Sequence, residues 1–263
     1  MNKLSLAALM LALSTLSLVG CAAPAMDDDA TEEEGDTSSL IINGKTDQAH
    51  PAVVAIQWNI AHADGTNGVA TCTGTVIGPK TILTAGHCVK PSDDTDEYSN
   101  YKVAFGTDFT QANAVIAGVE AIPHPSYDPS VFGNNDVGII VLETATTVKP
   151  LRIAQVITNM TGKTVTHVGF GKTDASGKTK NHTKQTVDLP VTMQTAHVLQ
   201  TGNGKSGICS GDSGGPMLSV NGQTKETLIV GVHSYVDNVK TCLGKGYSTR
   251  TDTVKDFVLA HIE

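Results

Sequence analysis

Three short motifs in this chain contain the residue types needed for nucleophilic catalysis. The motif TAGHC contains His87, NND ends at Asp136, and GDSGGP contains Ser213. A serine hydroxyl is a weak nucleophile near neutral pH, so it needs a base within hydrogen-bond reach and a third group that orients the base. His87 and Asp136 are 49 residues apart and Asp136 and Ser213 are 77 apart, so only folding can assemble them.

The segments between these motifs predict the strands that must position them. Short apolar runs rich in Val, Ile and Thr are separated by Gly, Pro, Asn and Asp, a pattern typical of an all-β sandwich or barrel. The runs lie at 53–56, 75–77, 138–142, 165–168 and 228–232.

One helix is predicted, at about 252–262, where it would pack against the strands and close the fold. Thr251 is its expected N-cap. Its apolar residues fall at helical spacing and are Val254, Phe257, Val258 and Ile262.

In their order and flanking residues the three motifs resemble the chymotrypsin/trypsin family of serine proteases, from about Ile41 to the C-terminus. The resemblance implies an all-β fold of two antiparallel six-stranded β-barrels with the site between them and a C-terminal helix. The implied protease domain covers 41–263, with barrel one at about 41–150 and barrel two at about 151–250.

The resemblance also assigns roles in peptide-bond hydrolysis through an acyl-enzyme. Ser213 would attack the scissile carbonyl, His87 would take its proton and later deliver it to the leaving amine, and Asp136 would hold His87. The backbone N–H groups of Gly211 and Ser213 would form the oxyanion hole. Glycine at 211 permits the backbone angles that turn its amide inward. Ser234 matches the family serine beside the triad aspartate.

The implied specificity pocket differs from that of trypsin. Gly207 stands where trypsin has the pocket-floor aspartate, so a buried Lys or Arg of the substrate would lack a charge partner. Val236 replaces a rim glycine, as in the elastases. We therefore expect apolar P1 residues of small to medium size. The substrate-binding residues implied are Gly207, Ile208, Ser234, Tyr235, Val236 and Gly246.

The motif IING at Ile41 resembles the new N-terminus of the activated family. There the freed α-ammonium buries itself against the acid that precedes the nucleophile, here Asp212. A buried charge needs a paired partner, so such an ion pair has a physical reason. The sequence therefore predicts a zymogen that is activated by cleavage before Ile41.

The N-terminus predicts export. An apolar stretch at 4–19 follows one lysine, and residues 1–20 are predicted to be a signal peptide. The next four-residue motif, LVGC, resembles a bacterial lipobox that ends at Cys21. The alternative is an ordinary signal peptide cut near Ala23 or Ala25. We expect lipidation of Cys21.

Residues 21–40 are predicted to be a disordered acidic linker or propeptide, because they contain seven acidic residues and almost no bulky apolar residue. The expected precursor is lipid-anchored at the cell envelope. Cleavage before Ile41 would then activate the enzyme and release it together, because no cysteine in 22–40 could keep the propeptide attached.

The chain has five cysteines, which leaves one without an internal partner. If Cys21 carries lipid, the other four can pair in three ways. The family resemblance implies Cys72–Cys88 and Cys209–Cys242. Disulfides fit an oxidising, extracytoplasmic location.

The net charge of −8 is concentrated in the linker, and residues 41–263 carry only −2. No basic patch suggests nucleic-acid binding. We expect protein or peptide substrates, protein protease inhibitors as partners, a monomer, and membrane contact only through the N-terminal lipid. No cofactor or metal is expected, since the loop 107–115 that can hold calcium in the family offers only Asp108.

The sequence has two rival interpretations. GDSGG also satisfies the G-x-S-x-G elbow of α/β-hydrolases, but those enzymes need their acid and histidine after the serine, and only 50 residues follow Ser213. The other rival is a catalytically weak, protease-fold binding lipoprotein. Such proteins typically lose a triad member or the oxyanion glycine, whereas this chain has all four residues.

Overall fold

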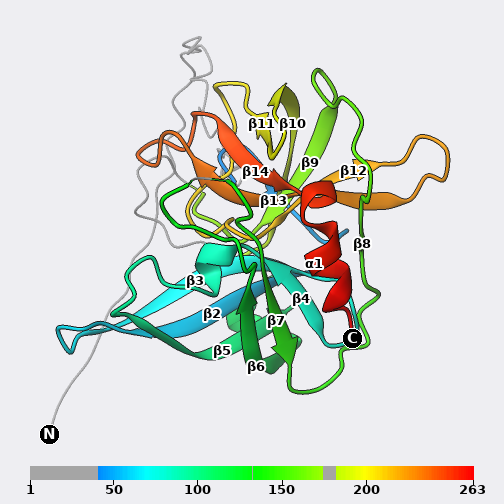
Figure 1. Cartoon of the computed structure of the whole chain (residues 1–263). Helices are drawn as coiled ribbons and strands as arrows, with labels where there is room; N and C mark the ends of the chain where they lie inside the picture. Colours follow the sequence, from blue (N-terminus) through cyan, green and yellow to red (C-terminus); the bar gives the residue numbers. More distant parts are fainter. Residues whose placement is uncertain (1–40, 132, 174–181) are drawn as a thin grey trace, which may run out of the picture. The chain divides into compact units, whose positions relative to one another are not determined.

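A computed structural model of the chain describes residues 41–131, 133–173 and 182–263. The strands form two closed six-stranded antiparallel β-barrels followed by a single α-helix (Figure 1), which confirms the predicted fold class. The predicted signal peptide, acidic linker and lipidated Cys21 lie outside the described residues. Within the described part of the chain, no helix has the length and apolar character required to cross a bilayer.

The first barrel carries the histidine and aspartate motifs. Its strands close in the order β2-β3-β4-β7-β6-β5. They are β2 (Val53–Ala61), β3 (Asn67–Val76), β4 (Thr81–Thr84), β5 (Glu97–Phe105), β6 (Ala114–Pro123) and β7 (Gly138–Leu142). Their β-branched and aliphatic residues fill the interior, since Ile56, Ile82 and Ile140 are fully buried.

The second barrel carries the serine motif. Its ring runs β9-β10-β11-β14-β13-β12 and closes because β9 pairs with both β10 and β12. The short β1 (Lys45–Thr46) pairs with β10, and β8 (Arg152–Ile153) pairs in parallel with β13. The ring strands are β9 (Thr164–Gly169), β10 (Gln185–Gln194), β11 (Val198–Thr201), β12 (Pro216–Val220), β13 (Thr227–Val236) and β14 (Gly246–Arg250).

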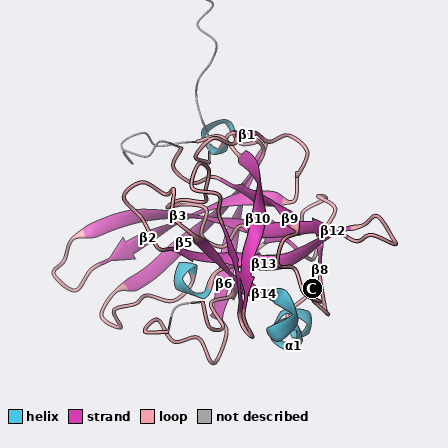
Figure 2. Cartoon of the chain, turned by 90° about the horizontal axis from the view of Figure 1, so that it is seen from above, coloured by secondary structure: helices cyan, strands magenta, loops and turns pink. Residues whose placement is uncertain are grey.

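The C-terminal helix is shorter than predicted. It is α1 (Lys255–Ala260), preceded by a 3-10 turn at Thr251–Thr253, and it lies to one side of the strands (Figure 2). The predicted N-cap was wrong, because the Thr251 hydroxyl donates to the carbonyls of Ala154 and Ile229 instead. Val254 and Val258 are buried as the spacing predicts, but Ile262 is 41% exposed.

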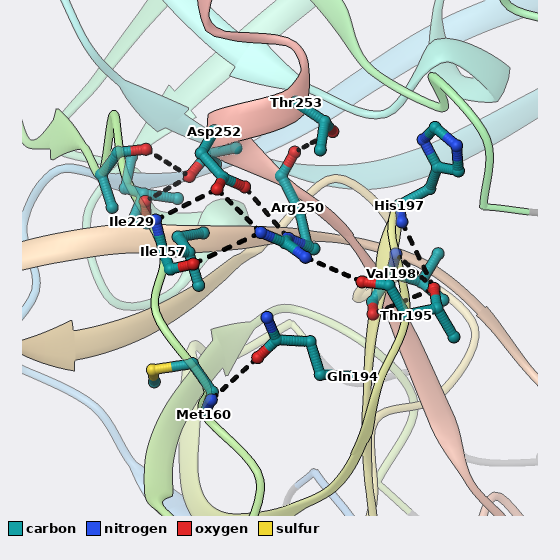
Figure 3. Close-up of polar contacts among 12 residues, drawn as sticks. Ile157, Met160, Gln194, Thr195, His197, Val198, Ile229, Arg250, Asp252 and Thr253 are labelled. Atoms are coloured by element: carbon teal, nitrogen blue, oxygen red, sulfur yellow. Dashed lines mark hydrogen bonds and ion pairs between the residues drawn. The ribbon is translucent and has the colours of Figure 1, made fainter.

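A polar cluster ties the end of β14 to two neighbouring loops (Figure 3). The Arg250 guanidinium donates from Nε and Nη2 to the two carboxylate oxygens of Asp252, over 3.0 and 2.8 Å, and from Nη1 to the Thr195 carbonyl. The Asp252 carboxylate also accepts the Ile157 N–H. Bidentate pairs of this kind are directional, so the cluster fixes the hairpin between β10 and β11 against the last strand.

Candidate active site

His87 and Asp136 are brought together on the first barrel. His87 lies in the 3-10 turn Gly86–Cys88 just after β4, and Asp136 precedes β7, which pairs with β4. The His87 Nδ1 is 2.9 Å from Asp136 Oδ2, and the His87 backbone N–H donates to Oδ1 over 3.0 Å. One residue thus presents both its backbone and its ring to the same carboxylate.

The buried Asp136 carboxylate is held in its ionised form. Burial raises its pKa, but the facing His87 imidazole and the hydrogen bonds outweigh burial and keep that pKa below its ordinary value. Ser234 donates its hydroxyl to Asp136 Oδ2 over 2.5 Å. An ionised carboxylate only accepts, so His87 Nδ1 carries a proton and its Nε2 is left as a base.

Ser213 lies on the loop that leads into β12, against the wall of the first barrel. Its carbonyl accepts the Thr73 N–H over 2.8 Å and lies 3.8 Å from Cys88 Sγ, in the residue after His87. Among the described residues, the Ser213 hydroxyl makes no hydrogen bond to His87. Catalytic hydrogen bonds are often long or poorly aligned before substrate binds.

Two glycines in the serine motif are required by the backbone. Gly211 has φ +98° and Gly214 has φ +80°, and a Cβ at Gly214 would lie 2.1 Å from Thr84 Oγ1. The Gly211 carbonyl is fixed by the Thr73 hydroxyl over 2.8 Å. The backbone N–H groups of Gly211 and Ser213 donate no hydrogen bond to another described residue. Both are therefore free to donate to a bound ligand.

Asp212 has a fully buried carboxylate. It accepts the N–H groups of Gly171 and Cys209, each over 2.8 Å, and a Cβ at Gly169 would lie 2.2 Å from its Oδ1. Burial raises the pKa of Asp212 to about 7, against the lowering effect of those hydrogen bonds. Among the described residues, no cationic side chain forms an ion pair with it.

The segment that begins at Ile41 is inserted into the second barrel's loops. Ile41 is fully buried, and Ile42 forms an antiparallel bridge with Gly207, six residues before Ser213. Ile41 has φ +40°, in the left-handed region that β-branched residues rarely adopt.

A cavity of about 460 Å³ opens beside Ser213. Of the predicted pocket residues, Ile208, Ser234, Tyr235 and Val236 line it. Gly207 and Gly246 are not among the lining residues. A Cβ at Gly207 would be 2.2 Å from the Cys242 carbonyl oxygen, and one at Gly246 would be 2.8 Å from Ile208 Cγ1. The rest of the lining is Cys209, Ser210, Ser213, His233, Asp237 and Val239.

Sequence reasoning missed four of these lining residues, Ser210, His233, Asp237 and Val239. His233 precedes Ser234 directly, but a histidine inside an apolar strand run gives no pattern signal. Asp237 and Val239 lie on the exposed loop after β13, where Asp237 accepts the Lys245 N–H over 2.7 Å. Only the fold shows that this loop borders the cavity.

Two disulfides brace the site, with the pairing that the resemblance implies. Cys72–Cys88 links β3 to the turn that holds His87, and Cys209–Cys242 links the serine loop to the loop after β13. The sulfur atoms of Cys72 and Cys88 lie near the His87 ring, but a disulfide supplies no thiolate ligand. The grouping is therefore not a metal site.

Comparison with known proteins identifies the family. A family model described as Trypsin matches residues 41–258. The chain belongs to the trypsin family. The venom serine protease of Polistes dominula is similar, with 29% identity over 213 residues, or 71% of this chain and 74% of the relative. Chymotrypsin-like elastase family member 1 of Bos taurus is 25% identical over 80% of this chain and 84% of its own length.

A third trypsin family relative is the chymotrypsin of Phaedon cochleariae, 28% identical over 73% of this chain and 74% of its own length. These similarities support a serine protease that acts on protein or peptide substrates. The relatives named here are animal proteins. The lipidation of Cys21, and the bacterial source that a lipobox would imply, therefore stay predictions.

Proposed function

We propose that this chain is an extracytoplasmic serine endopeptidase in which Ser213 is the nucleophile, His87 the general base and Asp136 the group that orients the base. The observation that carries the proposal is the ionised Asp136 carboxylate. It accepts a hydrogen bond from His87 Nδ1–H, which leaves His87 Nε2 on the far side of the ring from Asp136. Ser213 lies on the adjoining loop and lines the cavity of about 460 Å³.

The proposed reaction uses these groups in sequence. Ser213 Oγ attacks the scissile carbonyl carbon while its proton passes to His87 Nε2, and Asp136 stabilises the imidazolium. The N–H groups of Gly211 and Ser213 bind the oxyanion. His87 then delivers the proton to the leaving amine, and water hydrolyses the acyl-enzyme by the same route in reverse.

Labelling with a fluorophosphonate tests the nucleophile. We expect one covalent adduct, located on Ser213 by peptide mass spectrometry, in protein that begins at Ile41. The His87→Ala variant should remain unlabelled because its serine has no base. A folded wild-type protein that takes no label would instead favour the non-catalytic binding protein.

The cavity supports the proposal of an apolar, small to medium P1 residue. Its wall contains Ile208 and Val236, and the floor position offers no carboxylate. An aspartate could not be added at Gly207 without a backbone shift, because its Cβ would lie 2.2 Å from the Cys242 carbonyl oxygen. A charge partner for Lys or Arg is therefore absent at the floor position. Asp237 also lines the cavity, but it is exposed on the loop after β13 and already accepts the Lys245 N–H.

The Val236→Gly variant should widen substrate choice. We expect the wild type to cleave after Ala, Val, Leu or Met faster than after Phe, Arg, Lys or Glu in matched peptides. Removing the Val236 side chain should raise kcat/KM for Phe relative to Ala by about tenfold or more. Val220→Ala, at an exposed position on β12, is the matched control and should leave the ratio of kcat/KM for Phe to that for Ala unchanged. Preferential cleavage after Arg or Lys by the wild type would contradict this pocket assignment.

We also propose activation by cleavage before Ile41, with release from a lipid anchor at Cys21. The trypsin family match begins at Ile41, and Asp212 is a buried carboxyl without a cationic side-chain partner among the described residues. A freed ammonium at Ile41 would supply that partner. The two disulfides fit an oxidising compartment.

Stability against pH should separate the uncleaved and cleaved forms. In the uncleaved chain the folded pKa of Asp212 lies above its unfolded value, so the unfolded state binds fewer protons and stability falls as pH rises from about 4 to about 7. In the cleaved form, pairing with the Ile41 ammonium should lower the pKa of Asp212, so stability should no longer fall over this pH range. We expect urea unfolding of the two forms, both carrying Ser213→Ala, to diverge over this pH range.

The Asp212→Asn variant is the control, since its two forms should not diverge. N-terminal sequencing of the active wild-type protein should give Ile41. Equal peptidase activity of the uncleaved and cleaved wild-type forms would refute the activation proposal.

A further inference from the structure

Two buried histidines lie next to each other, and one of them, His233, lines the cavity. His167 belongs to β9 and His233 to β13, and β12 lies between these strands in the sheet. Both residues are fully buried. His167 Nδ1 is 2.9 Å from His233 Nε2, with ring centroids 4.9 Å apart and ring planes 25° from parallel. This short N–N distance at that centroid separation means an in-plane N–H···N hydrogen bond rather than face-to-face stacking.

The surroundings determine which nitrogen carries each proton. His233 Nδ1 is 3.1 Å from the Asp212 carbonyl oxygen, which can only accept, so Nδ1 carries the proton. A neutral imidazole has one N–H, so His233 Nε2 must accept. His167 must then donate from Nδ1, and its Nε2 has no partner among the described residues.

Both rings are neutral in the folded protein. Burial lowers the pKa of His233 to about 4, and burial followed by the neighbouring ring lowers the pKa of His167 well below its ordinary value. Their cross-strand neighbours Met217 and Ser248 do not titrate. The Asp212 carboxylate is bonded to Gly171 and Cys209 instead.

The hydrogen bond to Asp212 acts on the peptide group that also contains the Ser213 N–H. The Asp212 carbonyl accepts from Gly215 N over 2.8 Å as well as from His233 Nδ1. In a planar trans peptide the carbonyl and the following N–H point in opposite directions. Holding the oxygen between these two donors therefore aims the Ser213 N–H away from them.

The loop is shaped to admit the imidazole. A Cβ at Gly215 would lie 3.0 Å from His233 Nδ1, so any larger residue there would crowd the ring. The backbone of His233 pairs with the same loop, since its N–H donates to Gly215 O and its carbonyl accepts Gly214 N. Strand β13 and the serine loop are thus joined by the ring and by the main chain.

We infer that His233, kept in one tautomer by His167, is a positioning residue that aims the Ser213 N–H at the oxyanion. The inference rests on the proposed function. Without the donor from His233, the Asp212 carbonyl keeps only Gly215, and the peptide group can rotate away from its productive orientation. An oxyanion donor acts mainly in the transition state. A misoriented Ser213 N–H should therefore lower kcat more than it changes KM.

Histidine nitrogen NMR tests the tautomers without any need for activity. In the full-length chain labelled with ¹⁵N-histidine, we expect both buried rings to carry their proton on Nδ1. Neither ring should titrate near the ordinary histidine pKa of about 6.5. A proton on Nε2 of either ring, or titration near that pH, would overturn the inference.

Kinetics of two His167 variants test the consequence for catalysis. His167→Leu removes the donor that fixes the His233 tautomer. We expect kcat to fall about 10- to 100-fold, which is no more than the fall expected when one oxyanion donor is removed. KM should stay close to the wild-type value. His167→Asn keeps an N–H donor near Nδ1 and should restore most of the rate. Affinity for a peptide aldehyde, which forms an oxyanion on Ser213, should fall in parallel with kcat.

Met217→Leu is the matched control. Met217 is buried opposite His167 but takes no part in the hydrogen bonds that join His167, His233 and the Asp212 carbonyl. It should retain the wild-type kcat. An active wild type with unchanged kcat in His167→Leu would overturn the positioning role and leave the proposed protease function intact. A wild type inactive on every peptide and aldehyde would overturn both, while the NMR result would still report the tautomers.

Discussion

The Ser213→Ala variant is expected to lose about 10⁶-fold in kcat. Without the hydroxyl no acyl-enzyme can form, and only binding and the oxyanion donors remain to assist direct attack by water. Folding should be unaffected, because the Ser213 hydroxyl makes no hydrogen bond to another described residue. Steady-state hydrolysis of a peptide with Ala at P1, together with thermal unfolding, measures both quantities.

Ser219→Ala provides a matched control on the same stretch of chain. Ser219 lies on β12, six residues after the nucleophile, and does not line the cavity. Its kcat should equal that of the wild type. If Ser213→Ala kept activity within about tenfold of the wild type, another nucleophile would have to be sought.

The Asp136→Asn variant is expected to lose about 10⁴-fold in kcat. The His87 backbone N–H donates to Asp136 Oδ1, so the amide oxygen of the variant must stay at that position. Its NH₂ group then occupies the Oδ2 position and faces His87 Nδ1. To accept from it, His87 must move its proton to Nε2, where it can no longer take the serine proton.

The tautomer argument can be separated from loss of structure. The Ser234→Ala variant removes a different donor from Asp136 Oδ2 and leaves the carboxylate in place, so its loss of kcat should be much smaller. Histidine nitrogen NMR on Asp136→Asn should show the His87 proton on Nε2. A variant with near-normal kcat, or with the proton still on Nδ1, would contradict the proposed role of Asp136.

Much of the fold was accessible from the sequence because β-branched residues gather where strands are buried. Four of the five predicted runs fall wholly on a strand, and 138–142 coincides with β7, whereas the run 75–77 extends one residue beyond β3. The helix start was predicted wrongly because a threonine next to an amphipathic stretch resembles an N-cap. Thr251 is buried instead, and two carbonyls from other segments take its hydroxyl. Those partners are distant in sequence, so no local pattern could reveal them.

In the candidate site too, local motifs predict some residues, and others depend on contacts that only the fold determines. Motifs with several matching residues identified His87, Asp136 and Ser213, and the fold brings the first two into direct contact. The sequence predicts Gly207 and Gly246 in the pocket by position alone, and neither is among the residues that line the cavity. The partnership of His167 and His233 depends on two strands on either side of β12, which only the barrel topology determines.

The positive φ of Ile41 bears on whether activation could be undone. A β-branched residue in that region costs of order 1–3 kcal/mol. If the proposed cleavage before Ile41 takes place, the new N-terminal residue has no φ constraint and that cost is removed. Re-forming the peptide bond would then have to restore this backbone cost and also separate the proposed ammonium from the Asp212 carboxylate. The proposed activation would therefore be thermodynamically biased against reversal by the enzyme itself.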